Sequence, residues 1–432
     1  MRASPSRALL ALILAAGFGG FSSVAGAADA PAAAASQAEN AVPPEFAKPF
    51  NEAQELMKAG NGAGALAKLK ELEALPNPTP YEKYLILRVR APAEYTTNDP
   101  ASAAADFEAL LSSSFLAAGD RLPLLKALAT IQYSSEQYPK ASAAIQRYLD
   151  AGGDDPQLRE LLPQTYYLSK DYAGAAKAYK TQVDATYAAG KVPQEKTLRL
   201  LASSYSQAND DAGYVTTLEH LAVSYPKNDY WKELVSRALH ADTKMSDRVY
   251  VDTYRLKSTV FGDVADTERM SYASLAMRIG FPAEAKKVLD DGLAKKTIPA
   301  ADQGEATKLR DMATRGAAQD KAQRAGNESA AKAAKDGNSL VSQGLLETLE
   351  GDAAAGAALL EQGVAKGGLK SPDEARLHLG YAQYKAGRLP DALASFKSVA
   401  PAGGTGAIAH VWVLYTQSQM QAAAAPSAAA SK

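Results

Sequence analysis

The chain has 432 residues, with 47 lysines and arginines against 48 aspartates and glutamates, and its formal net charge is −1 at pH 7. Such balanced charge argues against a nucleic-acid partner, which requires a basic surface, and against a polybasic membrane-binding patch. The sequence contains no cysteine, which excludes disulfides, thiolate metal sites, a cysteine nucleophile and the lipid-bearing cysteine of a bacterial lipoprotein.

The N-terminal segment 1–27 has the pattern of a secretory signal peptide. Arg2 and Arg7 supply the positive start, Ala8–Ala16 the apolar core, and Ala25–Ala27 a small-residue cleavage site. The apolar stretch is short for a bilayer span, which favours cleavage over an uncleaved membrane anchor. Cleavage near Ala27 removes two arginines and leaves a charge of −3 (−1 − 2). The mature protein is therefore expected in the periplasm, or secreted.

Residues 28–43 are rich in alanine and proline, which predicts a disordered linker. From residue 44 to residue 300 one spacing recurs: a small residue, a turn about seven positions later, a second small residue at +12 and a bulky apolar residue at +16. The residues that open each unit, including two units beyond residue 338, are Ala53, Ala91, Ala129, Pro163, Ala202, Ala238, Ala273, Gly344 and Gly380.

Successive units start roughly 34–39 residues apart, which is the period of paired-helix repeats. The interval from Ala273 to Gly344 is about twice as long as the others. Small residues let two antiparallel helices approach closely, and the bulky residue one turn later fills the seam between neighbours. The sequence therefore predicts an all-α solenoid of about ten antiparallel helix pairs, one of them degraded near residue 308. An irregular helical bundle is the alternative, because alanine is so common that small residues recur at this spacing by chance.

Residues 301–338 are polar and charged, and they predict a helical connector, either a weakly packed joint or a hinge. Residues 339–420 predict two further repeats and a capping helix, in which Ile408, Val411, Trp412 and Tyr415 form one apolar face. A ligand platform at Trp412 is the less favoured interpretation. The tail from 421 to 432 is expected to be disordered.

The units resemble tetratricopeptide repeats, and the resemblance covers roughly residues 44–401. It is best in 157–190 and 371–401; the first of these carries Tyr166, Asp171, Tyr172, Ala175 and Tyr179. Tyr250 stands where a small residue is usual, and Arg376 where tryptophan or a similar residue is usual. The resemblance implies a binding groove lined by the first helix of each pair. The residues that map to this groove are Lys126, Thr130, Tyr133, Gln164, Tyr167, Arg199, Ser203, Ser206, Tyr381, Tyr384 and Lys385.

Motifs for catalysis or cofactor binding are not found in the sequence. The glycine-rich stretch at 60–64 is followed by no Lys-Ser or Lys-Thr pair and predicts only a turn. The four histidines (His220, His240, His378 and His410) do not pair at metal-ligand spacing. We therefore expect no enzyme activity, no cofactor and no metal.

The sequence is best interpreted as a non-catalytic scaffold of the bacterial cell envelope that binds a protein or an extended peptide in its groove. Tyrosines outnumber phenylalanines 21 to 9, which suits peptide recognition because tyrosine buries area and keeps a hydroxyl. Two alternatives remain open: a glycan-binding module of the wall or of an exported polysaccharide, and a self-assembling structural spacer. No nucleic acid and no membrane insertion are expected, and the oligomeric state is left open.

Overall fold

The computed structural model describes residues 42–240 and 245–424, so the expected signal peptide and nearly all of the expected linker lie outside the described residues. Within these ranges the chain forms twenty α-helices and two short 3-10 helices, and no strand. It divides into two compact units. The first runs to Ala189 and includes Ser203–Asp210, and the second comprises Gly190–Ala202 and the chain from Asp211 onward. The predicted all-α fold of stacked helix pairs is confirmed.

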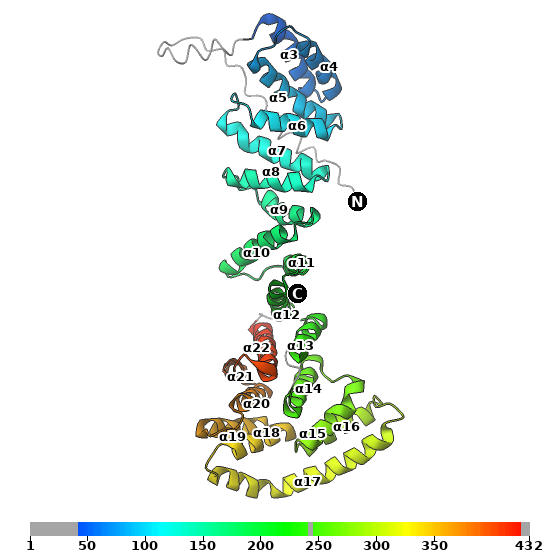
Figure 1. Ribbon diagram of the computed structural model, residues 1–432, viewed down its shortest axis with the longest axis vertical. Helices are drawn as coiled ribbons and strands as arrows, with labels where there is room; N and C mark the ends of the chain where they lie inside the picture. The colour runs from blue at the N-terminus through cyan, green and yellow to red at the C-terminus, as the bar shows by residue number, and fades with distance from the viewer. Residues whose placement is uncertain (1–41, 241–244, 425–432) are drawn as a thin grey trace, which may run out of the picture. The chain divides into compact units, whose positions relative to one another are not determined.

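The first unit is a succession of helix pairs (Figure 1). Its helices are α3 (Pro44–Lys58), α4 (Gly62–Glu73), α5 (Pro80–Thr96), α6 (Pro100–Leu111), α7 (Arg121–Ser134), α8 (Tyr138–Asp150), α9 (Pro156–Leu168) and α10 (Tyr172–Ala188), with the 3-10 turn η1 (Ala118–Asp120) before α7. Each helix packs extensively on the next, and α3 also packs on α5. Helix α11 (Glu195–Gln207) contributes residues to both units.

The second helix of several pairs starts at a side-chain cap. Asn61 accepts a hydrogen bond from the Gly64 amide (2.9 Å) at the start of α4, and Asp171 accepts one from the Gly174 amide (2.9 Å) at the start of α10. These caps satisfy amides that have no partner within the helix. The repeated turn residues of the sequence therefore act as helix starts.

The small residues of the repeat lie where the helices meet, as predicted. Ala53 on α3 and Ala65 on α4 are fully buried, and Leu69 one turn later is 1% exposed. In the last pair, a methyl group added at Gly380 would lie 2.6 Å from the ring of Phe396. Only a residue without a side chain permits this approach.

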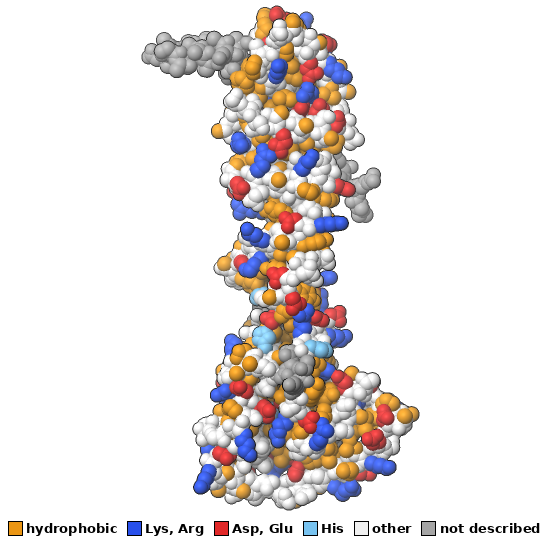
Figure 2. Space-filling model, in the orientation of Figure 1, with side chains coloured by type: hydrophobic (Ala, Val, Ile, Leu, Met, Phe, Trp, Pro, Cys, Tyr) orange, Lys and Arg blue, Asp and Glu red, His pale blue; other side chains and the backbone are white. Residues whose placement is uncertain are grey.

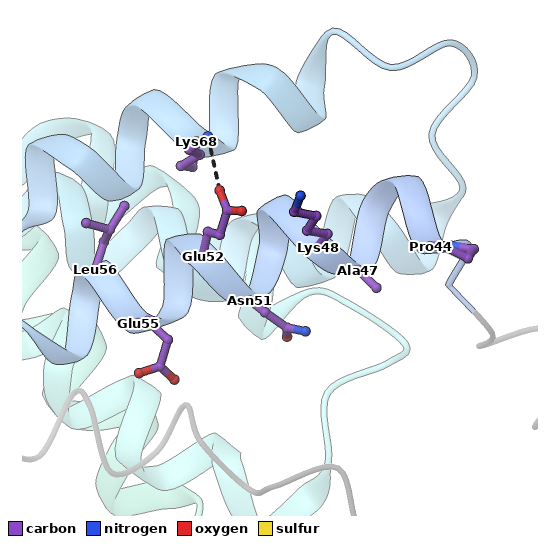
Figure 3. A pocket seen from close by; sticks show the side chains of 8 residues that line it. All are labelled: Pro44, Ala47, Lys48, Asn51, Glu52, Glu55, Leu56 and Lys68. Atoms are coloured by element: carbon purple, nitrogen blue, oxygen red, sulfur yellow. Dashed lines mark ion pairs between the residues drawn. The ribbon is translucent and has the colours of Figure 1, made fainter.

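The first pair has a shallow groove of about 750 Å³, lined by both polar and apolar side chains (Figure 3). Lys68 of α4 pairs with Glu52 of α3 there (3.1 Å), and exposed Asn51 and Glu55 face solvent. Charged side chains therefore lie beside the apolar residues Pro44, Ala47 and Leu56 in this groove.

The second unit continues the pairs with one long helix among them. Its helices after α11 are α12 (Asp211–Ser224), α13 (Asn228–His240), α14 (Asp247–Phe261), α15 (Arg269–Arg278), α16 (Pro282–Ala294), α17 (Gln303–Ala333), α18 (Asn338–Glu350), α19 (Ala353–Lys366), α20 (Pro372–Lys385), α21 (Leu389–Lys397) and α22 (Gly403–Ala424), with the 3-10 turn η2 (Asp266–Glu268) before α15.

Helix α17 explains the long interval in the repeat between Ala273 and Gly344. It is one continuous helix of 31 residues that buries only Ala306, Ala313 and Ala331, in place of the degraded pair expected near residue 308. It packs on α15, α16 and α18. The polar composition of 301–338 follows from this exposure, because a helix with so narrow a buried stripe is mostly solvated.

Helix α22 closes the second unit. The expected apolar face is present, with Ile408, Val411 and Trp412 at 0%, 2% and 1% exposure, and Trp412 stacks on Phe396 of the last pair (5.3 Å). The same helix also packs on α12, α13 and α14, as the red helix beside the green ones shows in Figure 1. The Tyr415 ring meets Trp231 of α13 edge-on (5.3 Å). The second unit is therefore a closed ring of helices. Residues 421–424 continue α22, and 425–432 lie beyond the described range.

A buried charge cluster lies inside this ring. Arg255 of α14 donates two hydrogen bonds to Glu284 of α16 (2.8 and 2.7 Å) and one to Asp252 on its own helix (2.6 Å). His378 of α20 contacts both oxygens of Asp252 (3.1 Å), and Tyr272 of α15 donates to Glu284 (2.7 Å). All five side chains are at most 6% exposed. Buried charges need such pairing, so the cluster ties four helices together.

Candidate functional site

Seven of the eleven residues that sequence mapping assigned to the groove lie in the first unit. They are Lys126, Thr130, Tyr133, Gln164, Tyr167, Ser203 and Ser206. Arg199, Tyr381, Tyr384 and Lys385 belong to the second unit. The mapped residues are therefore divided between two separate bodies of the molecule.

On α7, the predicted residues follow one face of the helix. Lys126 forms an ion pair with Asp155, the residue that caps α9, and this hydrogen bond lowers the pKa of Asp155. The Thr130 hydroxyl donates to the Lys126 carbonyl oxygen (2.8 Å). Tyr133, one turn further, is half-buried and meets Tyr138 edge-on (5.7 Å). Lys126 is thus already engaged within the fold, whereas Tyr133 presents part of its ring at the surface.

On α9, Tyr167 repeats the environment of Tyr133 in the next pair. Its ring meets Tyr172 edge-on (5.3 Å), and its hydroxyl is 2.8 Å from the Ser203 hydroxyl. Gln164 and Ser206 are exposed beside them. Edge-to-face pairs of this kind hold aromatic rings in place.

A buried tyrosine joins the two pairs. Burial raises the pKa of Tyr179 to about 12, and the neighbouring Tyr167 and Tyr133 add to this shift. Tyr133 and Tyr167 therefore both lie near Tyr179. We call the surface formed by Tyr133, Tyr138, Tyr167, Tyr172 and Ser203 the tyrosine face.

Sequence mapping missed Tyr138 and Tyr172, because both begin second helices while the resemblance assigns the groove to first helices. The signal was present nonetheless: the pairs 133/138 and 167/172 have the same internal spacing and recur in consecutive repeats.

In the second unit, the predicted tyrosines take part in helix packing. The rings of Tyr381 and Tyr384 lie 5.7 and 5.2 Å from Trp412 of α22, and burial raises the pKa of both hydroxyls. Arg199 and Lys385 are exposed. The sequence could not show that α22 would pack on the side of α20 that carries Tyr381 and Tyr384.

Charges of both signs are interspersed along the first unit on the face shown in Figure 2. In the described ranges, no group of three or more histidine, aspartate and glutamate side chains is arranged to hold a metal ion. Of the helices in residues 42–240 and 245–424, none is both long enough and apolar enough to cross a membrane.

Comparison with known proteins gives a partial match. Residues 126–186 and 350–407 match the tetratricopeptide repeat family model, one segment in each unit. No curated protein sequence matches the chain. Proteins built from such repeats generally mediate protein–protein interaction and are typically non-enzymatic scaffolds.

Many chains of solved structures match this chain, including the following two. The Naa15/Naa10 complex bound to HypK-THB is 14% identical, with 88% of this chain and 63% of that chain covered and a TM-score of 0.25. This chain therefore spans less than two thirds of that protein. The TPR domain of P58(IPK) is 9% identical, with 88% and 99% covered and a TM-score of 0.22. The family model matches two segments of the chain, and the larger of them, 126–186, contains most of the tyrosine face.

Proposed function

We propose that the protein is a non-catalytic scaffold that binds a protein or an extended peptide on the tyrosine face. The observation that carries this proposal is the recurrence of one aromatic pair in consecutive repeats, Tyr133 with Tyr138 and Tyr167 with Tyr172. A repeated, half-buried aromatic surface suits an extended chain, since each repeat offers the same contact to successive parts of the ligand.

The hydroxyl groups add polar contacts to this surface. Tyr167 shares a hydrogen bond with Ser203 (2.8 Å), whereas the Tyr133 hydroxyl makes no hydrogen bond to the part of the chain that the structure describes. Partial burial raises the pKa of Tyr133, so this hydroxyl stays protonated at neutral pH and can donate to a backbone carbonyl of a ligand.

We further propose that the scaffold works in the bacterial cell envelope, in the periplasm or after secretion. The support for this part of the proposal is the sequence of segment 1–27 alone. The closed ring of the second unit supports a scaffold over an open-ended spacer, because α22 already covers the edge of the last helix pair.

The test is crosslinking in cells of the full chain, tagged at its C-terminus, followed by mass spectrometry of the captured material. Tyr133→Ala/Tyr167→Ala removes the aromatic surface, and Tyr133→Phe/Tyr167→Phe removes only the hydroxyls. Tyr250→Ala is the control, because Tyr250 is 40% exposed and belongs to the second unit.

We expect one dominant envelope protein, lost in the alanine double variant and retained in the control. Recovery of wall fragments would instead assign the face to glycan binding, and recovery of the chain alone would assign the protein to self-assembly. Either result would overturn the proposed function. Cell fractionation of the same strain tests the compartment independently.

A further inference from the structure

A second surface of the first unit has the features of a binding groove. It has a volume of about 670 Å³ and runs along α9 between α8 and α10. The residues that line it include Leu149, Arg159, Leu162, Tyr166, Lys177 and Gln182. Since successive residues of a helix are rotated by about 100°, these positions of α9 lie on a different side from Gln164 and Tyr167. The groove is therefore separate from the tyrosine face.

A proline in α9 shapes this groove. Pro163 stands where other units have a small residue, and its ring nitrogen cannot donate to the Arg159 carbonyl oxygen four residues earlier. The Gln182 amide of α10 donates to that oxygen instead (2.8 Å). Pro163 and Gln182 both line the groove. The hydrogen bond from Gln182 therefore holds α10 against α9 along the groove.

The floor of the groove is apolar. Leu162 is buried at 8% exposure, and Leu149 and Tyr166 are partly buried against the core of the first unit. Burial raises the pKa of the Tyr166 hydroxyl, and the nearby carboxylates of Asp171 and Asp150 raise it further. An apolar side chain of a ligand would thus find apolar neighbours and one tyrosine ring at the bottom.

The lining of the groove contains two cations, Arg159 and Lys177, and one carboxylate, Asp171. Asp171 accepts a hydrogen bond from the Gly174 amide (2.9 Å), which holds it at the start of α10. Exposed Arg159 and Lys177 form no ion pair with any residue in the described ranges. The charged side chains that line the groove therefore carry a net charge of +1 (+2 − 1).

We propose that the groove between α8 and α10 binds an extended segment of a partner protein that carries a carboxylate next to a leucine or an aromatic residue. The carboxylate meets Arg159 and Lys177, and the apolar side chain packs on Leu149, Leu162 and Tyr166. The volume lies in the range of ligand sites. Lys177, Thr181 and Ala185 follow one another along α10 and are exposed, so the groove is open to solvent along this edge.

The test uses the full chain and a peptide array. The array holds hexapeptides with one aspartate or glutamate and one leucine or phenylalanine in every arrangement, in a glycine-serine background. Matched arrays replace the acid with its amide or with lysine. Affinities of the best peptides are then measured by fluorescence anisotropy at low and high salt.

Three variants assign the site. Arg159→Gln/Lys177→Gln removes the unpaired charges, and Ala178→Trp fills the groove without changing charge. Lys140→Gln/Lys397→Gln removes two exposed cations elsewhere and serves as the matched control. Circular dichroism confirms that each variant is folded.

We expect binding to the acidic array only, a loss of affinity of about tenfold in the charge variant and in Ala178→Trp, and no change in the control. Equal binding to the amide array, or no acidic peptide bound, would overturn the proposal. Loss in Tyr133→Ala/Tyr167→Ala alone would move the peptide to the tyrosine face. A dimer in sedimentation equilibrium that Arg159→Gln/Lys177→Gln dissociates would assign the groove to a second copy.

Discussion

The two units use the same repeat in different ways. In the first unit, each helix packs on its neighbours in sequence, from α3 to α10. In the second, α22 returns to α12, α13 and α14, and the contact between His410 and Glu219 (2.8 Å) joins residues 191 apart in sequence. The first unit is therefore built from local contacts, whereas the second depends on contacts between its two ends.

This difference decides which tyrosines remain available. The rings of Tyr133 and Tyr167 in the first unit meet the rings of Tyr138 and Tyr172 edge-on at a partly open surface. Tyr381 and Tyr384 of the second unit pack on Trp412. In the second unit, α22 thus covers the tyrosines of α20, whereas the corresponding tyrosines of the first unit stay partly open. This difference favours the first unit for partner binding.

The largest expected effect comes from removing α22. Deletion of 403–432 takes away the buried side chains of Ile408, Val411, Trp412 and Leu414, each of which stabilises the fold by roughly 1.5–3 kcal/mol. We expect the second unit to lose more than about 6 kcal/mol and to open. The emission of Trp231, buried at 2% exposure, should shift to the red.

Deletion of 425–432 alone is the control, since it leaves the whole of α22. If the longer deletion leaves the emission of Trp231 unchanged, the second unit is a linear stack like the first, and the comparison fails. Proteolysis of the first unit should be the same in both variants.

The buried cluster gives the next largest effect. Arg255→Met leaves Asp252 and Glu284 buried without their shared cation. Such a loss costs about 3–5 kcal/mol. Both tryptophans of the chain, Trp231 and Trp412, lie in the second unit. Urea unfolding followed by tryptophan fluorescence should therefore show the loss, while circular dichroism retains a transition from the first unit.

Arg248→Met provides the matched control, because Arg248 lies exposed on the same helix. We expect a change of less than about 0.5 kcal/mol there. Equal effects of the two substitutions would mean that the cluster does not hold the ring together.

The spacing of small and bulky residues predicted the helix pairs, because residues at this spacing pack against each other within one pair. Ala65 and Leu69 occupy the seam that their positions in the repeat require. The same spacing carries no information on ring closure, since Tyr415 and Trp231 meet only after the helices from α14 to α21 are placed. For the same reason the long interval between Ala273 and Gly344 revealed an irregular unit but not the single long helix α17.

The candidate site divides in the same manner. The positions of Tyr133 and Tyr167 within their repeats predicted that both lie on one face. These positions could not show that Lys126 is paired with Asp155, the cap residue of the following helix. Partner contact at any of the mapped residues stays a prediction. The groove between α8 and α10 was not predicted, because it depends on how Gln182 replaces the hydrogen bond that Pro163 removes.

A smaller effect is expected from a poorly paired carboxylate in the first unit. Burial and the charge of Asp106 raise the pKa of Glu94 to about 7. Arg90 lies closer to Asp106 (2.6 Å) than to Glu94 (3.7 Å), and one Glu94 oxygen is buried without a hydrogen bond. Because the folded state holds this proton more tightly than the unfolded chain, stability falls as pH rises from about 4.5 to about 7.

Glu94→Gln should therefore stabilise the first unit by about 1–2 kcal/mol at pH 8 and by much less at pH 5. Urea unfolding followed by circular dichroism measures this, with the transition of the second unit fixed from tryptophan fluorescence. Exposed Glu160 offers the control substitution Glu160→Gln. A stabilisation of equal size at both pH values would show that Glu94 is ionised in the folded protein throughout.

The smallest effect tests whether the first unit depends on purely local contacts. Gln182→Ala leaves the Arg159 carbonyl oxygen without its donor (now at 2.8 Å), at a cost of about 0.5–1 kcal/mol. Pro163→Ala supplies an amide hydrogen to the same oxygen, so in that background the cost of Gln182→Ala should fall to near zero. The coupling free energy of this double-mutant cycle, measured by urea unfolding, should equal the cost of the single substitution. A coupling of zero would mean that water replaces Gln182 freely, and that the walls of the groove are positioned by the packing of α9 on α10 alone.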